Sequence, residues 1–503
     1  MFCYRLWILV VLMALRAGPV LAGSDEFQLV QRPWFLTRTV HFNIYSCGPI
    51  PETDKLAARL EQFCDAYSVL AGTNAIASSP VVVMAFPNEQ SMQPFLPLYQ
   101  GKPDNAAGFF THGSDENLIV LALPGADSAS SGMDVIFHEY AHLLFRRNDR
   151  IWPLWLKEGM AEIYSTFETS GDEVQIAQPI GHHLHLLAHE PLMPLHELFA
   201  VTPQSTQYNE STRQGIFYAE SWLLTDYLMA GDNPAYRARF GQFTQLLLQG
   251  ELPEQAFTNA LGTTLPTMEM QLRRYLERGQ FVPITLTLPK NLSSSVAVNS
   301  QMIAPVETYF RLGDELLRID RLDAAESYFA QGKKLAPASP LPYEGLGLLA
   351  AQRGQHDEAL RDLKEALQHG STSFLAYYVY AQEKYRLTAD DQNRYSPLKG
   401  EEAAEIRSEL EASIRLMPDF GPAHELLGFF EMVQGENLTA ANQQLQLAIQ
   451  LEPENSSYLL TLAQAQLRNR NPTAARQTLE PLLLPNVDAK LRTIAKKMIQ
   501  ENE

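Results

Sequence analysis

Hydrophobic and polar residues follow two periods in the N-terminal part of the chain, one typical of strands and one typical of helices. From Thr39, residues 40, 42 and 44 are apolar, which predicts a strand. Residues 51–70 carry large apolar side chains at helical spacing. Residues 81–86 are a continuous apolar run, as expected of a strand buried on both faces. Residues 108–112 and 117–123 are apolar stretches joined by a short polar turn, which predicts a hairpin.

Small residues recur with a period of 34 in the C-terminal part. Gly313 recurs as Gly347 and Ala325 as Ala359, and a large apolar residue follows each alanine four positions on. A period of this length in paired helices is the tetratricopeptide pattern. Less regular units continue to about residue 490, and residues 388–400 interrupt the third unit. Such units stack into a superhelix whose concave face suits peptides, and a purely structural role is also consistent with the pattern.

A HExxH motif at residues 138–142 carries the clearest chemistry in the chain. His138 and His142 are spaced i, i+4, so both imidazoles project from one face of a helix and can reach one metal ion. Glu139 would act on a zinc-bound water as general base. Apolar residues flank the motif, so the helix is expected to be buried. The alternative is a pair of core histidines bonded to backbone groups.

Residues 152–162 would complete this zinc site. Glu158 is expected to be the third protein ligand, which leaves the fourth position open for water or substrate, as catalytic zinc requires. Glu162 lies one turn later on the same face and could accept a hydrogen bond from the free ring nitrogen of a ligating histidine. Gly159 and Ala161 are small enough to let the motif helix and the Glu158 helix approach closely around a metal. The alternative is that both glutamates are solvated.

The HExxH motif followed by a W-L-x-E-G-x-A-E segment resembles the gluzincin zinc metallopeptidases, above all their bacterial peptidase MA-like branch. The resemblance covers roughly residues 35–280. It implies one zinc ion held by His138, His142 and Glu158, with Glu139 as general base. It also implies that Glu162 is the carboxylate that hydrogen-bonds to a ligating histidine. It also implies a mixed sheet that precedes the metal-bearing helices.

Two further segments bear on the kind of peptidase. Residues 217–224 resemble the tyrosine-bearing helix start of aminopeptidase-type gluzincins, which makes Tyr218 a candidate donor to the oxyanion. A packing role for Tyr218 is equally consistent. The glycine-rich exopeptidase signature is missing from residues 117–123, so an aminopeptidase is not supported. By analogy, strand 117–123 could be the sheet edge that receives an extended peptide.

Histidines and cysteines outside the motif give weaker signals. Residues 176–198 contain five histidines, His182, His183, His185, His189 and His196. Interleaved leucines favour a packed loop and short helix over a second metal site, although one histidine could line the cleft. Cys47 and Cys64 have no spacing typical of a metal or redox site. A disulfide and two buried free thiols both remain open.

The N-terminus indicates where the protein is located, and the net charge indicates which partners are excluded. Residues 1–22 combine a short positive region, an apolar run and a small-residue cleavage site, which predicts a signal peptide and a secreted or periplasmic protein. Residues 24–34 are expected to be a mobile leader. The net charge is −19, and such an acidic protein repels nucleic acid and anionic membranes. No later stretch is expected to span a membrane.

These patterns predict an α+β protein in which a small mixed sheet and a helical zinc-peptidase domain at 35–280 precede a linker at 281–304. An all-α tetratricopeptide superhelix follows at 305–490. The predicted function is that of a secreted zinc metallopeptidase whose repeats bind substrate or a partner protein. Two alternatives remain: a repeat scaffold with an inactive or structural zinc domain, and a zinc hydrolase of a non-peptide amide such as a cell-wall crosslink.

Overall fold

A computed structural model describes residues 28–72, 81–99, 102–103, 108–113, 115–123, 132–145, 152–209, 211–289, 299–453, 455–484 and 487–502. The predicted signal peptide lies outside the described residues. The end of the predicted leader is packed rather than mobile, because Leu29, Val30 and Trp34 are buried and Trp34 donates to the Leu29 carbonyl. Within the described segments, no helix is long and apolar enough to cross a membrane.

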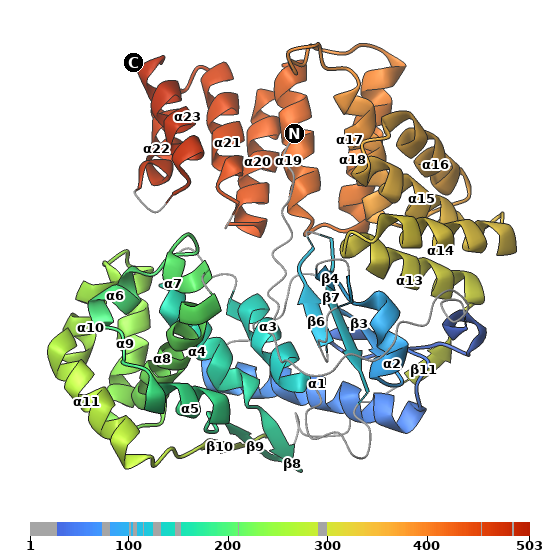
Figure 1. The fold of residues 1–503 in the computed structure, drawn as a ribbon. Coiled ribbons are helices and arrows are strands. Elements are labelled where there is room, and N and C mark those ends of the chain that lie inside the picture. The colour runs from blue at the N-terminus through green and yellow to red at the C-terminus, as the bar shows by residue number, and fades with distance from the viewer. Residues whose placement is uncertain are drawn as a thin grey trace.

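A six-stranded mixed sheet forms the centre of the N-terminal part, in the order β11-β1-β2-β3-β7-β6 (Figure 1). Its strands are β1 (Phe35–Arg38), β2 (Phe42–Ser46), β3 (Val81–Phe86), β6 (Gly108–Thr111), β7 (Asn117–Ala122) and β11 (Asn299–Met302). β3 pairs in parallel with β2 and β7, whereas β6 and β7 form the predicted antiparallel hairpin. The predicted edge role of residues 117–123 is wrong, because β7 lies between β3 and β6.

The central strand β3 is buried on both faces, as its apolar run predicted. Val81, Val83 and Ala85 belong to the core that includes α1 (Ile50–Ala71) and α3 (Met133–Phe145). The alternate residues, Val82, Met84 and Phe86, belong to a second core on the opposite face. This alternation follows from the two-residue period of a strand. The two faces of one sheet therefore support different parts of the molecule.

Helices surround the first core and complete the N-terminal part. They are α4 (Leu154–Ser165), α5 (Gly181–His189), α6 (Leu195–Ala200), α7 (Thr206–Asn209), α8 (Ser211–Met229), α9 (Pro234–Leu248), α10 (Pro253–Leu261) and α11 (Leu265–Arg278). The histidine-rich tract forms α5 and α6, which agrees with a packed loop and short helix. Short elements on the far side of the sheet are η1 (Leu29–Gln31), α2 (Glu89–Met92), η2 (Gln93–Phe95) and the pair β4 (Leu98–Tyr99) and β5 (Lys102–Pro103).

The segment expected to be a linker is partly sheet. β10 (Ile284–Thr287) pairs with β9 (Glu173–Ile176), which in turn pairs with β8 (Glu168–Ser170). β11 pairs with β1, so Phe35 lies opposite Met302. The sequence did not predict these strands, because the segment is rich in proline and serine. Each strand also forms only beside a partner more than a hundred residues earlier in the chain. Residues 281–304 thus belong in part to the six-stranded sheet and in part to the three-stranded sheet.

Paired helices make up the rest of the chain and form an arc in Figure 1. They are α13 (Pro305–Arg318), α14 (Leu322–Leu335), α15 (Pro340–Gln352), α16 (His356–Gln368), α17 (Phe374–Arg386), α18 (Glu401–Leu416), α19 (Gly421–Gln434), α20 (Leu438–Leu451), α21 (Ser457–Arg468), α22 (Pro472–Leu479), η4 (Glu480–Leu483) and α23 (Ala489–Gln500). The predicted insertion between α17 and α18 is mostly exposed, but its Tyr395 ring packs 4.5 Å from that of Tyr385.

The periodic glycines explain why these helices pair so closely. A Cβ atom on Gly313 would lie 2.6 Å from the Phe329 ring, and one on Gly347 would lie 2.6 Å from the Leu363 side chain. Real Cβ atoms do not approach other atoms at this distance. In these two pairs the first helix therefore needs glycine where the large residue of the second helix packs, which is the physical basis of the 34-residue pattern.

The first repeat is joined to the sheet by a buried contact that combines rings and charges. The Phe95 ring stacks on Phe86 and meets the Tyr328 ring of α14 edge-on, at 5.9 Å. Arg318 of α13 donates from Nη1 to Asp115 Oδ1 at 3.1 Å and from Nε to Asp314 Oδ2 at 3.0 Å. All three charged side chains are largely buried. The first repeat and the sheet therefore share one continuous core.

Replacing Arg318 with methionine is expected to destabilise the protein strongly. The side chain would still fill space, but the buried carboxylates of Asp115 and Asp314 would lose their cation, which typically costs about 3–5 kcal/mol. Chemical denaturation of the full chain measures this. The matched control is Arg353→Met, because Arg353 pairs with the solvent-exposed Asp323. This substitution should lower the free energy of unfolding by about 1 kcal/mol or less. Equal effects of the two substitutions would contradict the structural role of the Arg318 contact.

Candidate metal centre

Two helices bring the predicted ligands together. α3 carries His138 and His142 on one face, and α4 presents Glu158 to the same point. The potential ligand atoms of these three residues lie within 4.8 Å of one another. His138 and Glu158 are buried, whereas 21% of the His142 side chain is exposed, so the cluster is reachable from one side.

The distances within the cluster fit a tetrahedral zinc ion. His142 Nε2 lies 3.1 Å from His138 Nε2 and 3.2 Å from Glu158 Oε2. His138 Nε2 lies 3.5 Å from the same carboxylate oxygen. Zinc bonds of about 2.0–2.2 Å in tetrahedral geometry place neighbouring nitrogen and oxygen ligands roughly 3.2–3.6 Å apart. These three residues therefore have the chemistry and the spacing to hold zinc.

The electrostatics of the cluster also favour a cation. Burial alone would lower the pKa of His138, but hydrogen bonding to Glu158 and the charges of Glu162 and Glu139 raise that pKa to about 9. Burial alone would raise the pKa of Glu158, but His142 and His138 hold it well below its usual range. Several carboxylates thus surround the two imidazoles, and a divalent cation would offset this negative charge.

A carboxylate and a third histidine lie behind His138. Glu162 Oε1 is 3.5 Å from His138 Nδ1, the ring nitrogen that faces away from the cluster centre. The other oxygen of Glu162 lies 3.3 Å from Nε2 of the buried His183 on α5. Glu162 therefore lies where the sequence predicted it. A carboxylate at this position fixes the orientation of a ligating imidazole, and His183 in turn positions the carboxylate.

The predicted oxyanion donor lies beside the cluster and has a tyrosine neighbour. The ring of Tyr218, on α8, is centred 6.4 Å from the His138 ring. The Tyr208 ring stacks on Tyr218 at 6.1 Å, and its hydroxyl donates to Glu158 Oε1 at 3.3 Å. Burial, followed by the charge of Glu158, raises the pKa of Tyr208 above its usual range. Two phenol side chains thus lie next to the candidate ligands.

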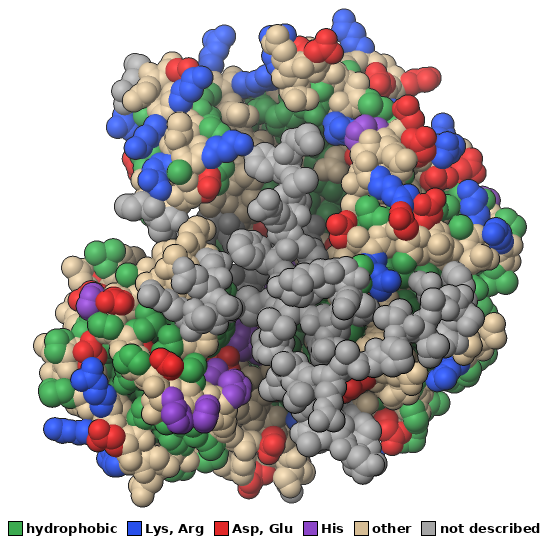
Figure 2. Space-filling view, viewed as in Figure 1, with side chains coloured by type: hydrophobic (Ala, Val, Ile, Leu, Met, Phe, Trp, Pro, Cys, Tyr) green, Lys and Arg blue, Asp and Glu red, His purple; other side chains and the backbone are tan. Residues whose placement is uncertain are grey.

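The sequence did not single out His183 within its histidine tract, and it gave no signal for Tyr208. His183 was one of five histidines in its tract, and nothing in the helical period distinguishes it from the exposed His182, His185 and His189. Figure 2 shows histidine side chains gathered on this face of the molecule. Within the described residues, no histidine of this tract joins a group of three converging metal ligands. Tyr208 lies in a short segment without periodicity, so no local signal could have selected it.

A glycine lets the two sides of the site meet. A Cβ atom on Gly159 would lie 2.1 Å from Thr225 Oγ1 and 2.3 Å from the Ser221 carbonyl oxygen of α8. α4 and α8 consequently pack backbone to backbone directly beside Glu158. The sequence predicted that Gly159 brings α4 close to the motif helix α3, but the helix that approaches α4 at Gly159 is α8. This contact holds Glu158 and Tyr218 on the same side of α3.

Comparison with known proteins identifies one part of the chain. Residues 306–339 match the tetratricopeptide repeat family, which confirms the predicted repeat. No curated protein sequence matches the chain. Among solved structures, the chain is similar to YrrB, described as a TPR protein with an unusual peptide-binding site, at 17% identity over 38% of this chain and 90% of that one, with a TM-score of 0.31.

Two further solved structures have comparable similarity. One is a thermophilic TPR protein from Thermus thermophilus, with 22% identity over 39% of this chain and 99% of that one and a TM-score of 0.30. The other is a tetratricopeptide repeat protein from Parabacteroides merdae, with 14% identity over 54% of this chain and 90% of that one and a TM-score of 0.29.

Substituting Gly159 with alanine is expected to destabilise the protein by about 1–3 kcal/mol, because the new methyl group forces α4 away from α8. The same displacement should move Glu158 and weaken zinc binding. Thermal unfolding and zinc retention measure the two effects. Gly241→Ala in α9 is the matched control: its Cβ would meet nothing within 4 Å, and it should stabilise by up to about 1 kcal/mol. Unchanged stability in Gly159→Ala would refute the tight contact.

Proposed function

We propose that the chain is a secreted or periplasmic zinc metallopeptidase with a protein-binding repeat array. The observation that carries this proposal is the convergence of His138, His142 and Glu158 at distances that suit tetrahedral zinc. Three protein ligands would leave one position for water, which distinguishes a catalytic zinc site from a closed structural one. A zinc ion held there would supply a water of lowered pKa and polarise a substrate carbonyl.

The surrounding residues have the roles that amide hydrolysis requires. Glu139 takes a proton from the attacking water and returns it to the leaving amine, as a general base that then acts as general acid. Its charge raises the pKa of both His138 and Tyr208, which is consistent with a position beside the cluster. The hydroxyl of Tyr218 donates to the developing oxyanion, with Tyr208 as a second donor of the same kind.

The repeats favour a protein as substrate or partner. Tetratricopeptide arrays bind peptides along their concave surface. The first repeat shares its core with the sheet, so a protein held by the array would have a defined position relative to the metal centre. The same repeats support a second candidate, a binding scaffold in which the zinc domain is inactive or structural. A zinc hydrolase of a non-peptide amide uses the same chemistry and is the third.

Cleavage of a mixed peptide library by the zinc-loaded chain, with new termini identified by mass spectrometry, separates these candidates. Glu139→Gln should retain zinc and lose about 10²–10⁴-fold in rate, because it removes only the proton acceptor. Glu190→Gln, which changes an exposed glutamate of the same domain, should cleave like the wild type. Cleavage by Glu139→Gln at the wild-type rate would show that Glu139 is not the general base. Absence of cuts by the wild type would favour a scaffold or a non-peptide substrate.

Zinc binding should fall in a graded series. Glu158→Ala removes a ligand and should weaken binding at this site more than Glu162→Gln does. Glu162→Gln removes only the charge behind His138 and should weaken binding about 10–100-fold, the usual loss for a partner of a ligand. Competition with a chelator of known affinity measures both variants. Wild-type affinity in Glu158→Ala would refute the ligand set, whatever the result of the cleavage assay.

A further inference from the structure

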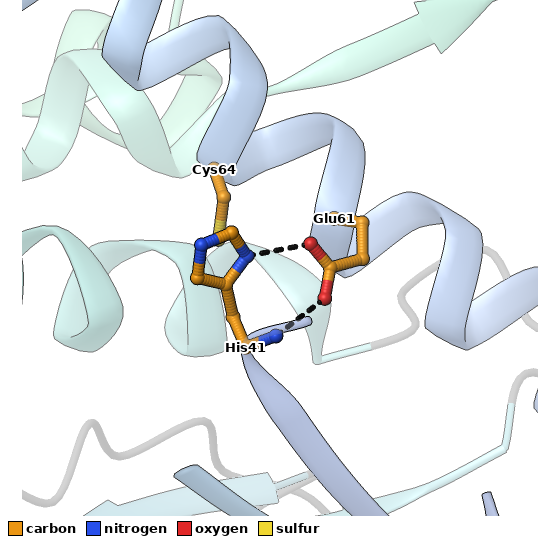
Figure 3. A group of neighbouring side chains, drawn as sticks. All are labelled: His41, Glu61 and Cys64. Atoms are coloured by element: carbon orange, nitrogen blue, oxygen red, sulfur yellow. Dashed lines mark hydrogen bonds and ion pairs between the residues drawn. The ribbon is translucent and has the colours of Figure 1, made fainter. Parts of the chain in front are cut away.

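A second group of potential metal ligands lies on the other side of α3 from the candidate zinc site. His41 lies in the turn before β2, and Glu61 and Cys64 lie one turn apart on α1. Their ligand atoms are all within 4.8 Å of one another. Figure 3 shows Glu61 and Cys64 projecting from α1 toward the His41 ring. An imidazole, a carboxylate and a thiol are the three ligand types that zinc prefers in proteins.

The carboxylate of this group is already oriented. His41 donates from its backbone N–H to Glu61 Oε1 at 2.8 Å, and its Nδ1 lies 2.6 Å from Glu61 Oε2. The second contact joins two potential ligand atoms directly. A metal ion would replace it and move the two atoms to roughly 3.3 Å apart, the spacing of neighbours around tetrahedral zinc. The backbone hydrogen bond would stay and continue to hold the carboxylate.

The thiol also has a partner of the kind that supports a metal ligand. Cys64 Sγ lies 3.3 Å from the hydroxyl of Tyr140, which can donate to a thiolate. Tyr140 is buried on α3, so this contact joins the group to the helix of the HExxH motif. Neither Cys64 nor Cys47 forms a disulfide. A hydrogen bond to a ligating sulfur orients the ligand and strengthens binding.

Charge and access are consistent with a cation. Asp65 follows Cys64 and lies one helical turn after Glu61 on α1, so two carboxylates share this side of the helix. The His41 side chain is 16% exposed and that of Glu61 is 6% exposed, so an ion can enter from the His41 side.

We infer that His41, Glu61 and Cys64 form a second divalent-metal site, suited to zinc, which ties the start of β2 to α1 and, through Tyr140, to α3. The ion is coordinated by the imidazole of His41, one oxygen of Glu61 and the thiolate of Cys64, whose proton is released on binding. Water completes the four ligands. The site is structural, since it lies against the core and away from the tyrosines that flank the first centre.

Cobalt(II) loading of the full chain tests this site separately from the first one. Cobalt bound to a thiolate has a near-ultraviolet charge-transfer band that a site of two histidines and one glutamate cannot produce. The wild type should take up two equivalents of cobalt and show the band. Cys64→Ala should lose the band and one equivalent, whereas the matched control Cys47→Ala should keep both. Glu158→Ala, which alters only the first site, should also keep the band.

Further variants guard against misfolding as an explanation. Glu61→Gln has the same shape and should weaken the cobalt affinity of this site at least tenfold, with the far-ultraviolet circular dichroism of the wild type. Tyr140→Phe should weaken it about 10–100-fold by removing the donor to sulfur. A wild type without the band, or a band that survives Cys64→Ala, would overturn the inference. Neither result would bear on peptide cleavage, because the proposed peptidase site contains no cysteine.

Discussion

The two-sided burial of β3 is the constraint on which the rest of the molecule depends. Val81 and Val83 face the helices that carry the candidate metal ligands, while Val82 and Met84 face the first repeat. A shift of one residue in the pairing of β3 with β2 or β7 would exchange the two sets and expose both cores to the wrong partners. The sheet therefore fixes the metal helices and the repeat array together, and the geometry of one cannot be set independently of the other.

Buried carboxylates are compensated differently at the two faces of this sheet. At the interface with the repeats, Arg318 supplies a permanent positive charge to Asp115 and Asp314. At the candidate zinc site the nearby positive groups of Glu158 are histidines, which are cationic only while they hold a proton. A histidine that binds zinc must give up that proton. The interface is thus complete as the chain folds, whereas the metal centre has a charge balance that an ion would complete.

Local spacing explains what the sequence could predict. His138 and His142 share a helical face because of i, i+4 periodicity, and Gly313 and Gly347 recur because each packs on a large residue of the paired helix. Long-range contacts explain what it could not. His183 reaches Glu162 from another helix, and β11 forms only beside β1. The spacing of cysteines could not reveal the group of His41, Glu61 and Cys64 for the same reason. His41 lies in the turn before β2, whereas Glu61 and Cys64 lie on α1.

The pairing of β10 and β11 makes the two halves of the chain one structural unit. A chain that ended at the predicted domain limit near residue 280 would lack one of the two partners of β1 and one of the two partners of β9. It would also expose Phe86 and Phe95, which pack toward Tyr328 of the first repeat. The repeats nearest the sheet consequently contribute to folding of the N-terminal region, whereas the later helix pairs have separate cores of their own. Different repeats of one array can therefore have different roles. The first repeat supports the sheet, and the distal repeats remain available to a protein partner.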